Sequence, residues 1–370
     1  MVIPCLNEVA TVGRCVQKAL QWFQAAGVQG EVIVVDNGSD DGSAAVAAEA
    51  GATVLFESRL GYGYAYQRGL AAARGDYIVM GDADDTYDFS EIPALLAPLR
   101  QGYDLVIGNR FSGGIQPGAM PWLHRYVGTP VITALVRLFS KITVGDSQSG
   151  MRAFTREAYQ RMQPRSGGME FASEMIVKAA RLGLRVTEVP ITYHPREGES
   201  KLRTFRDGWR HLRYLLLHTP GYTFTVTGAV LLLLGVLALA SQLLGPSQGL
   251  HIGSLQWQPV FLSTILLVIG ANAVVLGTTA KLYAVRHGII PEDWEVRFVR
   301  RWLNLEVLLA AGAGLLLTGL LIDGYIFYQW ATLGSEAPDR IGLASAAQAL
   351  IITGANVAFS SFLISLIDAD

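Results

Sequence analysis

The chain has 370 residues, of which 51% are hydrophobic, and its formal net charge is −2. This apolarity excludes an ordinary soluble protein, and the length exceeds the roughly 100 to 200 residues of a typical domain. The charge balance gives no reason to expect a nucleic-acid partner, which would need a basic surface. Cys5 and Cys15 lack the spacing of a metal site or a disulfide, so they fit a reduced compartment.

The first 110 residues alternate short apolar runs with helix-like segments. Such alternation predicts an α/β domain with a mostly parallel sheet that helices cover. After an opening strand, we expect strands at about 31–35, 52–56, 76–80 and 103–107, with helices at about 9–27, 42–50, 62–73 and 90–100.

Acidic residues gather where the strand at 76–80 ends, and they include Asp82 and Asp84. In open α/β sheets, ligands bind beyond the carboxyl ends of the strands. Hard divalent ions take carboxylate oxygens together with substrate phosphates. Two positions apart on an extended segment, Asp82 and Asp84 project to the same side. The alternative is a solvated acidic turn that caps the next helix.

Polar turns also end two other strands, with Asn7 and Glu8 after the first and Asp36 after the second. Further motifs follow in the order Gly108-Asn109-Arg110-Phe111, Asp146-Ser147-Gln148-Ser149-Gly150-Met151-Arg152-Ala153-Phe154, Glu188-Val189-Pro190-Ile191 and Arg196-Glu197-Gly198-Glu199-Ser200-Lys201-Leu202. Together these motifs resemble family 2 glycosyltransferases with the GT-A fold, in the branch of dolichyl-phosphate mannosyl- and glucosyltransferases. The resemblance covers residues 1 to about 215.

This resemblance implies a site for a nucleotide-diphosphate sugar and a Mg²⁺ or Mn²⁺ ion. The expected donor site is lined by Pro4, Asn7, Glu8, Asp36, Asp82, Ala83 and Asp84. In it, Asp36 would accept a hydrogen bond from the base, and Asp82 and Asp84 would hold the metal. Thr86 stands where relatives can carry a Gln, which leaves Asp85 or water as the third ligand. Plain helix capping is the alternative role for Glu8 and Asp36.

The resemblance also implies the catalytic residues, which are Asp84, Arg110, Arg125 and Arg152. Of these, Arg110 and Arg125 would lie near the acceptor phosphate, with Glu170 in the same region. Arg suits this task because it binds phosphate in a bidentate manner. A surface ion pair is the alternative for any single Arg.

A basic loop follows, in which Gly198 gives the chain freedom between Arg196 and Lys201. By resemblance, Arg196, Ser200 and Lys201 bind the donor diphosphate when this loop closes over it. The expected reaction needs no strong general base, because a phosphate monoester has a second pKa near 6 and is mostly ionised at neutral pH.

The sequence therefore predicts an inverting, metal-dependent transfer of a hexose from a nucleotide-diphosphate sugar to a polyprenyl phosphate. Glucose or mannose is favoured over an N-acetyl sugar. The choice between UDP-glucose and GDP-mannose stays open, as does the choice between undecaprenyl and dolichyl phosphate as the acceptor.

Residues 204–218 are predicted to form an amphipathic helix that lies in the membrane interface. Its apolar stripe consists of Phe205, Trp209, Leu212 and Leu216, and the neighbouring stripe consists of Arg203, Arg206, Arg210 and Arg213. The alternative is a helix docked on the catalytic core with solvated arginines. This helix separates a GT-A domain at 1–203 from a membrane domain at 219–370.

Four apolar segments in the C-terminal part are long enough to cross a bilayer core, which takes about 20 residues. They lie at about 222–244, 257–280, 303–328 and 341–367. The loop at 281–302 is rich in Lys and Arg, whereas 245–256 has none and 329–340 has only Arg340. By the positive-inside rule, that loop and the catalytic domain face the cytoplasm. Whether the chain forms a homo-oligomer stays open.

Two other functions remain as alternatives. A processive polysaccharide synthase of the same superfamily would carry Gln-x-x-Arg-Trp before a channel helix, and the nearest match, which ends at Arg301-Trp302, lacks the Gln. A transferase fused to a lipid-carrier translocase would need a polar path through the membrane helices, which contain hardly any charge.

Overall fold

The computed structural model describes residues 1–198, 201, 203–219, 221–244, 250–252, 255–257, 260–288, 290, 292–334 and 340–368. It divides into two compact units, Met1–Leu215 and Leu216–Asp370. Ser200, predicted to bind the donor, lies outside the described residues.

The first unit contains a seven-stranded sheet in the order β3-β2-β1-β4-β6-β5-β7. The strands are β1 (Val2–Cys5), β2 (Ile33–Asp36), β3 (Thr53–Phe56), β4 (Tyr77–Met80), β5 (Leu105–Asn109), β6 (Arg152–Thr155) and β7 (Val186–Pro190). All pairings are parallel except those of β6, which runs antiparallel to both β4 and β5. The expected mostly parallel α/β sheet is therefore confirmed, and the carboxyl ends of β1, β2 and β4 meet at one edge.

Helices cover both faces of the sheet, as the alternating side chains of each strand require. On β1, for example, Val2 belongs to one buried apolar cluster and Ile3 to the other. The helices of this unit are α1 (Val12–Ala25), α2 (Ser43–Glu49), α3 (Tyr62–Ala72), α4 (Ile92–Arg100), α5 (Arg110–Gly113), α6 (Thr129–Ser140), α7 (Arg156–Met162), α8 (Phe171–Arg181) and α9 (Thr204–Leu217). Shorter helical turns are η1 (Phe89–Glu91) and η2 (His124–Gly128).

Within its described residues, the second unit contains four helices long and apolar enough to cross a membrane, which confirms the expected four-helix region. The candidate spans are Gly221–Ser241, Phe261–Arg286, Leu305–Leu333 and Ile341–Ile367. The second span begins later than expected because Trp257 pairs with Leu250 in a hairpin of β8 (Leu250–Ile252) and β9 (Leu255–Trp257). The elements of this unit are η3 (Gly221–Val226), α10 (Thr227–Leu244), α11 (Val260–Arg286), α12 (Trp294–Trp302), α13 (Leu305–Leu333) and α14 (Ile341–Asp368).

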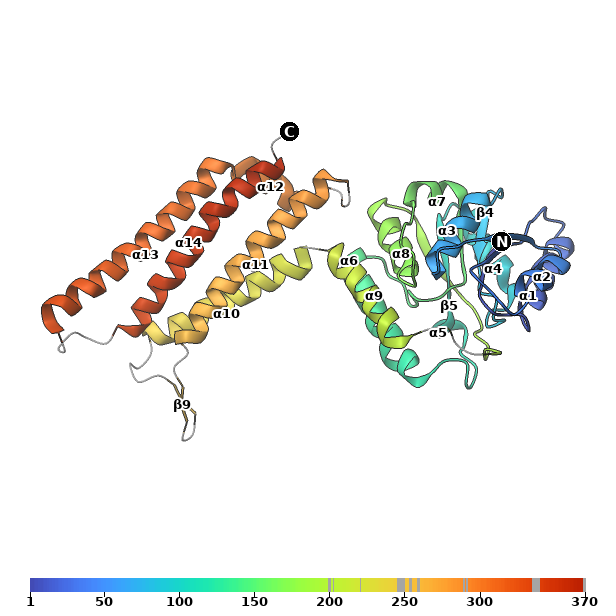
Figure 1. Ribbon diagram of the computed structural model, residues 1–370, viewed down its shortest axis with the longest axis horizontal. Helices are drawn as coiled ribbons and strands as arrows, with labels where there is room; N and C mark the ends of the chain where they lie inside the picture. Colours follow the sequence, from blue (N-terminus) through green and yellow to red (C-terminus); the bar gives the residue numbers. More distant parts are fainter. Residues whose placement is uncertain are drawn as a thin grey trace. The chain divides into compact units, whose positions relative to one another are not determined.

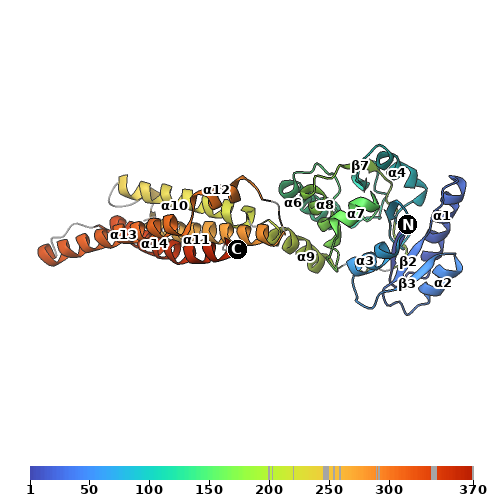
Figure 2. The same cartoon turned by 90° about the horizontal axis from the view of Figure 1, so that it is seen from above.

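Within this unit α13 packs along α14, and α10 packs along α11 (Figure 1, Figure 2). Small residues permit the close approach of α13 and α14. A Cβ atom added at Gly354 would lie 2.7 Å from Gly312 O and 2.4 Å from Leu316 N. Close backbone contact through small residues is a common basis of helix packing in membranes.

We therefore expect Gly354→Leu to destabilise the membrane unit by about 1–3 kcal/mol, because a larger side chain must push α13 and α14 apart. The measurement is the unfolding temperature of the purified full chain in detergent. Gly324→Leu on α13 is the matched control, since an added Cβ at Gly324 meets no atom within 4 Å. Equal shifts in the two variants would contradict this packing.

Candidate active site

The segments that follow β1 and β2 are joined by hydrogen bonds to side chains. Asn7 adopts a positive φ of 53° just after β1. Its backbone N–H donates to Ser39 Oγ at 2.9 Å, and its side-chain Oδ1 accepts from Asp40 N at 2.9 Å. The N–H of Glu8 donates to Ser43 Oγ at 2.8 Å. These bonds place Asn7 and Glu8 beside the turn that follows β2.

Asp36 ends β2 and is only 3% exposed. Its Oδ2 accepts from Gly38 N and Ser39 N, each at 3.2 Å. Its Oδ1 is buried and accepts no hydrogen bond from any described residue. A buried acceptor without a donor is costly, so Oδ1 fits an N–H donor supplied by a ligand. This matches the chemistry of the predicted contact to a nucleobase.

Asn37, the next residue, has a structural task that the sequence did not reveal. Its Nδ2 donates to Glu57 O and to Arg59 O, both at 2.9 Å, and its Oδ1 accepts from Gly61 N at 2.8 Å. Both polar groups of its side chain therefore hold the segment 57–61 beside the end of β2.

Asp82 and Asp84 follow β4, and each is oriented by hydroxyl donors. Asp82 Oδ1 accepts from Tyr62 OH at 3.2 Å and from Tyr66 OH at 3.4 Å. Asp84 Oδ1 accepts from Thr86 Oγ1 at 2.7 Å. Burial and the neighbouring carboxylate of Asp84 raise the pKa of Asp82. A cation at this position would relieve both effects.

These two carboxylates fit the donor set of a Mg²⁺ or Mn²⁺ ion, because such ions use one or two protein carboxylates and complete their shell with phosphate and water oxygens. Among the described residues, no group of three or more His, Cys, Asp or Glu side chains is placed to hold a metal. Asp85, a candidate third ligand, instead pairs with Lys18 at 2.7 Å and has a φ of 57°. Thr86 orients Asp84, so water and the ligand's own oxygens are left to complete the shell.

Arg196 supplies positive charge to this carboxylate cluster. Its Nη1 lies 2.9 Å from Asp84 Oδ2, and its Nη2 donates to Glu8 Oε1. Its Nε is buried and has no partner among the described residues. Burial raises the pKa of Glu8 to about 7, and Arg196 opposes that rise. The structure therefore brings the predicted loop residue Arg196 to the carboxylates, while Lys201 is exposed.

Arg110, predicted to serve the acceptor, is held firmly by a buried carboxylate. Its Nε and Nη2 lie 2.6 and 2.9 Å from the two oxygens of Asp146. Its guanidinium also stands over the Tyr193 ring, 5.0 Å from the centroid. The charge of Arg110 lowers the pKa of Asp82, although burial and Asp84 have larger effects. Arg110 is therefore a fixed cation whose field reaches the predicted metal ligands.

Arg152, also predicted to be catalytic, is fully buried. It donates to the carbonyl oxygens of Ser149, Ala172 and Ser147 at 2.8, 2.6 and 2.7 Å. This revises the expectation for Arg152, because a guanidinium committed to three backbone carbonyls holds the 147–149 loop against α8 rather than presenting itself to a phosphate.

The other predicted site residues have varied surroundings. Pro4 lies in β1, and Ala83 is buried between the two carboxylates. Arg125 lies on η2 with its guanidinium over the Tyr126 ring. Glu170 precedes α8, accepts from Gly168 N at 3.2 Å through Oε1, and leaves Oε2 buried without a partner among the described residues. Glu170 thus keeps a buried acceptor free, as Asp36 does.

Exposed aromatic side chains lie on two amphipathic segments of this unit, of which only α9 was expected. Phe205 and Trp209 of α9 are 86% and 59% exposed. Trp122 and Tyr126, at or beside η2, are 67% and 59% exposed. His124 Nε2 lies 2.9 Å from Thr204 Oγ1, which joins the two segments. The four-residue spacing of Trp122 and Tyr126 was a sequence signal for this second segment.

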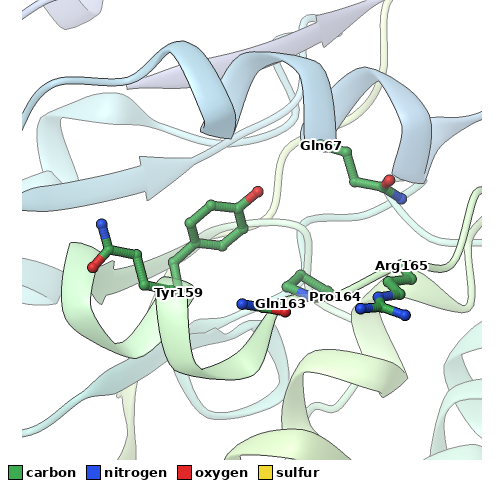
Figure 3. Close-up of a pocket in the computed structure, with 6 residues that line it drawn as sticks. Gln67, Tyr159, Gln163, Pro164 and Arg165 are labelled. Atoms are coloured by element: carbon green, nitrogen blue, oxygen red, sulfur yellow. The ribbon is translucent and has the colours of Figure 1, made fainter.

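A hollow of about 310 Å³ opens elsewhere on the unit, between α3 and α7. It is lined by Gln67, Tyr159, Gln160, Gln163, Pro164 and Arg165, of which all but Gln160 are labelled in Figure 3. None of the predicted site residues lines this hollow, which is therefore separate from the carboxylate site.

Comparison with known proteins agrees with this geometry. Residues 1–162 match the family "Glycosyl transferase family 2", and residues 278–368 match "Glycosyltransferase family 2 C-terminal transmembrane region". The chain is 39% identical to the low-salt glycan biosynthesis hexosyltransferase Agl6 of Haloferax volcanii, over 98% of this chain and 87% of that protein. It is 35% identical to a dolichyl-phosphate hexose transferase of the same organism, over 48% of this chain and 76% of that protein. A crystal structure of a mycobacterial protein covers 58% of this chain and 72% of its own, with a TM-score of 0.50 and 26% identity.

We expect Asp84→Asn to weaken Mn²⁺ binding by at least about tenfold, because the variant loses one of two charged ligands. The measurement is electron paramagnetic resonance of Mn²⁺ added with a nucleoside diphosphate to the full chain in detergent. Asp85→Asn is the matched control, since Asp85 pairs with Lys18. A loss of affinity in Asp85→Asn equal to that in Asp84→Asn would contradict the assignment.

Proposed function

This chain belongs to glycosyltransferase family 2, and we propose that it transfers a hexose from a nucleotide-diphosphate sugar to a polyprenyl phosphate. The observation that carries the proposal is the meeting of three features at one sheet edge. These are the unpartnered acceptor of Asp36, the oriented pair Asp82 and Asp84, and the guanidinium of Arg196. Asp36 suits the nucleobase of the donor, and Asp82 and Asp84 suit a metal ion bound to its diphosphate. Arg196 then provides a second positive charge for the same diphosphate.

The donor half of the reaction uses the carboxylates. Asp82 and Asp84 would hold the divalent ion, which neutralises charge that develops on the departing diphosphate. Arg196 would exchange its carboxylate partners for diphosphate oxygens, because a guanidinium binds phosphate and carboxylate with the same fork of N–H donors. Glu8 and Asp84 would then be released from Arg196. Lys201 and Ser200 would add to the same contact when the loop closes.

The acceptor half uses the arginines. Arg110 and Arg125 would bind the lipid phosphate, with Glu170 in the same region. An ionised phosphate oxygen attacks the anomeric carbon, the bond from that carbon to the diphosphate oxygen breaks, and the nucleoside diphosphate leaves. The proton balance needs no protein base, because the nucleophile is already ionised at neutral pH. A single displacement inverts the anomeric centre.

The membrane supplies the acceptor to this site. The exposed Phe205, Trp209, Trp122 and Tyr126 are aromatic side chains of the kind enriched at membrane interfaces. We place α9 and η2 on the bilayer surface, where the phosphate of a polyprenyl lipid resides. The dolichyl-phosphate acceptor named for one relative supports this class of substrate.

Transfer should be measured with the full chain in lipid nanodiscs that contain undecaprenyl or dolichyl phosphate. Radiolabelled UDP-glucose, GDP-mannose and UDP-N-acetylglucosamine serve as donors in parallel reactions. We expect one hexose donor to give a labelled lipid, EDTA to abolish the reaction, and Asp84→Asn to slow it by at least about a hundredfold. Asp85→Asn should retain activity. The absence of labelled lipid with every donor, or full activity in EDTA, would contradict the proposal.

The side of the membrane is a separate prediction, motivated by Lys281, Arg286, Arg297, Arg300 and Arg301 in the 281–302 loop. The positive-inside rule places this loop and the catalytic unit in the cytoplasm. Reporter fusions within 281–302 and within 329–340 should give opposite signals, with the first on the cytoplasmic side. The same signal from both loops would overturn the four-span topology.

A further inference from the structure

A chain of polar side chains, all buried except the partly buried Gln148, links α9 to the loop that carries the buried carboxylate of Asp146. His211 of α9 is 5% exposed, and its Nδ1 lies 2.8 Å from Ser173 Oγ of α8. Gln148 Nε2 donates to Ser173 Oγ at 3.2 Å and to Ser147 Oγ at 3.0 Å. Ser147 Oγ lies 3.0 Å from Thr133 Oγ1 of α6. We call His211, Ser173, Gln148, Ser147 and Thr133 the polar relay.

Gln148 is the donor at the centre of the polar relay. The side-chain amide of Gln148 donates one hydrogen to each serine, so Ser173 keeps its own hydroxyl hydrogen. Ser173 can donate that hydrogen to His211 Nδ1, in the imidazole tautomer that carries its own hydrogen on Nε2. Burial, with a smaller effect from Arg152, lowers the pKa of His211 to about 4. The imidazole is thus neutral at physiological pH, in agreement with this hydrogen bond.

The relay ends on the loop that holds Arg110. Gln148 N donates to Asp146 Oδ1 at 3.2 Å, and the same carboxylate binds Arg110 through both of its oxygens. Ser147 N donates to Thr133 Oγ1 at 3.2 Å. A shift of Gln148 must therefore change the hydrogen bonding of Asp146, which fixes the guanidinium of Arg110.

The other end of the relay lies on the helix that precedes the first membrane span. The buried face of α9 consists of Asp207, His211, Tyr214 and Leu215, whereas Phe205 and Trp209 are exposed. The apolar stripe in the sequence predicted the exposed face of α9 and gave no sign of the buried one. Any change in how α9 lies on a bilayer would be transmitted through its buried face, and His211 is the side chain of that face that reaches the relay.

We propose that His211 is a positioning residue that couples the seating of α9 to the 146–149 loop and so to the orientation of Arg110. The proposal rests on the proposed function, in which Arg110 binds the lipid phosphate and α9 lies on the membrane. The acceptor site is then correctly formed only when the helix that meets the lipid is correctly placed. The donor site lies at the ends of β1, β2 and β4, and none of its described side chains is hydrogen-bonded to the relay, so Arg110 acts on it only through its charge.

The test compares His211→Leu, which removes the acceptor of the Ser173 hydroxyl, with His211→Asn, whose Oδ1 replaces Nδ1. Ser173→Ala breaks the same link from the other side. Gln160→Leu, at an exposed position of α7, is the control for a polar residue replaced by leucine. All variants are studied as the full chain in lipid nanodiscs.

For His211→Leu and Ser173→Ala, we expect the KM for polyprenyl phosphate to rise about tenfold, as the loss of one buried hydrogen bond allows. The KM for the sugar nucleotide and the unfolding temperature should stay at wild-type values. His211→Asn and Gln160→Leu should match the wild type. A purely structural role for His211 would raise both KM values or lower the unfolding temperature, and either result would overturn the proposal.

Amide hydrogen exchange gives a readout that does not depend on the reaction. The backbone N–H groups of Ser147 and Gln148 donate to Thr133 and Asp146, so they report on the loop directly. We expect both to exchange at least about tenfold faster in His211→Leu, and neither to change in Gln160→Leu. Unchanged exchange in His211→Leu would overturn the coupling. If the wild type transfers no sugar to polyprenyl phosphate, the proposed function fails, and this comparison still decides whether His211 positions the loop.

Discussion

Carboxylates that gather at one edge of a buried parallel sheet repel one another, and the catalytic unit is organised around the cations that offset this repulsion. Strand direction brings Glu8, Asp36, Asp82 and Asp84 to the same edge. Each is then oriented by hydroxyl, backbone or guanidinium donors. Arg196 bridges Glu8 and Asp84, and the predicted metal ion would provide the remaining charge. In the proposed function, these carboxylates would exchange Arg196 for the metal ion while the sheet stays unchanged.

Two arginines that look equivalent in the sequence have different environments. Arg110 is bound to Asp146 through Nε and Nη2, and its guanidinium stands over the Tyr193 ring. Arg152 donates hydrogen bonds to three backbone carbonyl oxygens inside the unit. A buried guanidinium is tolerated only when its donors are satisfied. The first arginine remains next to the site, while the second maintains the loop on which the first depends.

The helix α9 serves two environments at once, because its faces differ. One face is buried against the catalytic unit through His211, Tyr214 and Leu215, and another presents Phe205 and Trp209. A helix that is both packed on the protein and suited to the membrane interface transmits position from one to the other. The sequence offered these as two alternatives; the structure shows the docked face, and the membrane contact of the other face stays a prediction.

The sequence by itself determined the class of each segment. Period-two and continuous apolar runs identified the strands, and long uncharged runs identified the four spans. The spacing of Asp82 and Asp84, together with the motif order, identified the family. These signals are local, because each depends on residues within about one element of each other. Segment ends were less well determined, as the hairpin at Trp257 shows, since strand pairing competed with the apolar pattern of the second span.

Only the tertiary structure decided which side chains became partners. Arg196 reaches Glu8 across 188 positions, His211 reaches Ser173 across 38, and the side chain of Asn37 bonds to the segment that follows β3. The relay, the commitment of Arg152 and the pairing of Asp85 with Lys18 belong to the same group. Composition and periodicity specify which face of an element is buried, whereas a hydrogen bond depends on the distance and direction between two atoms, which only the packed chain sets.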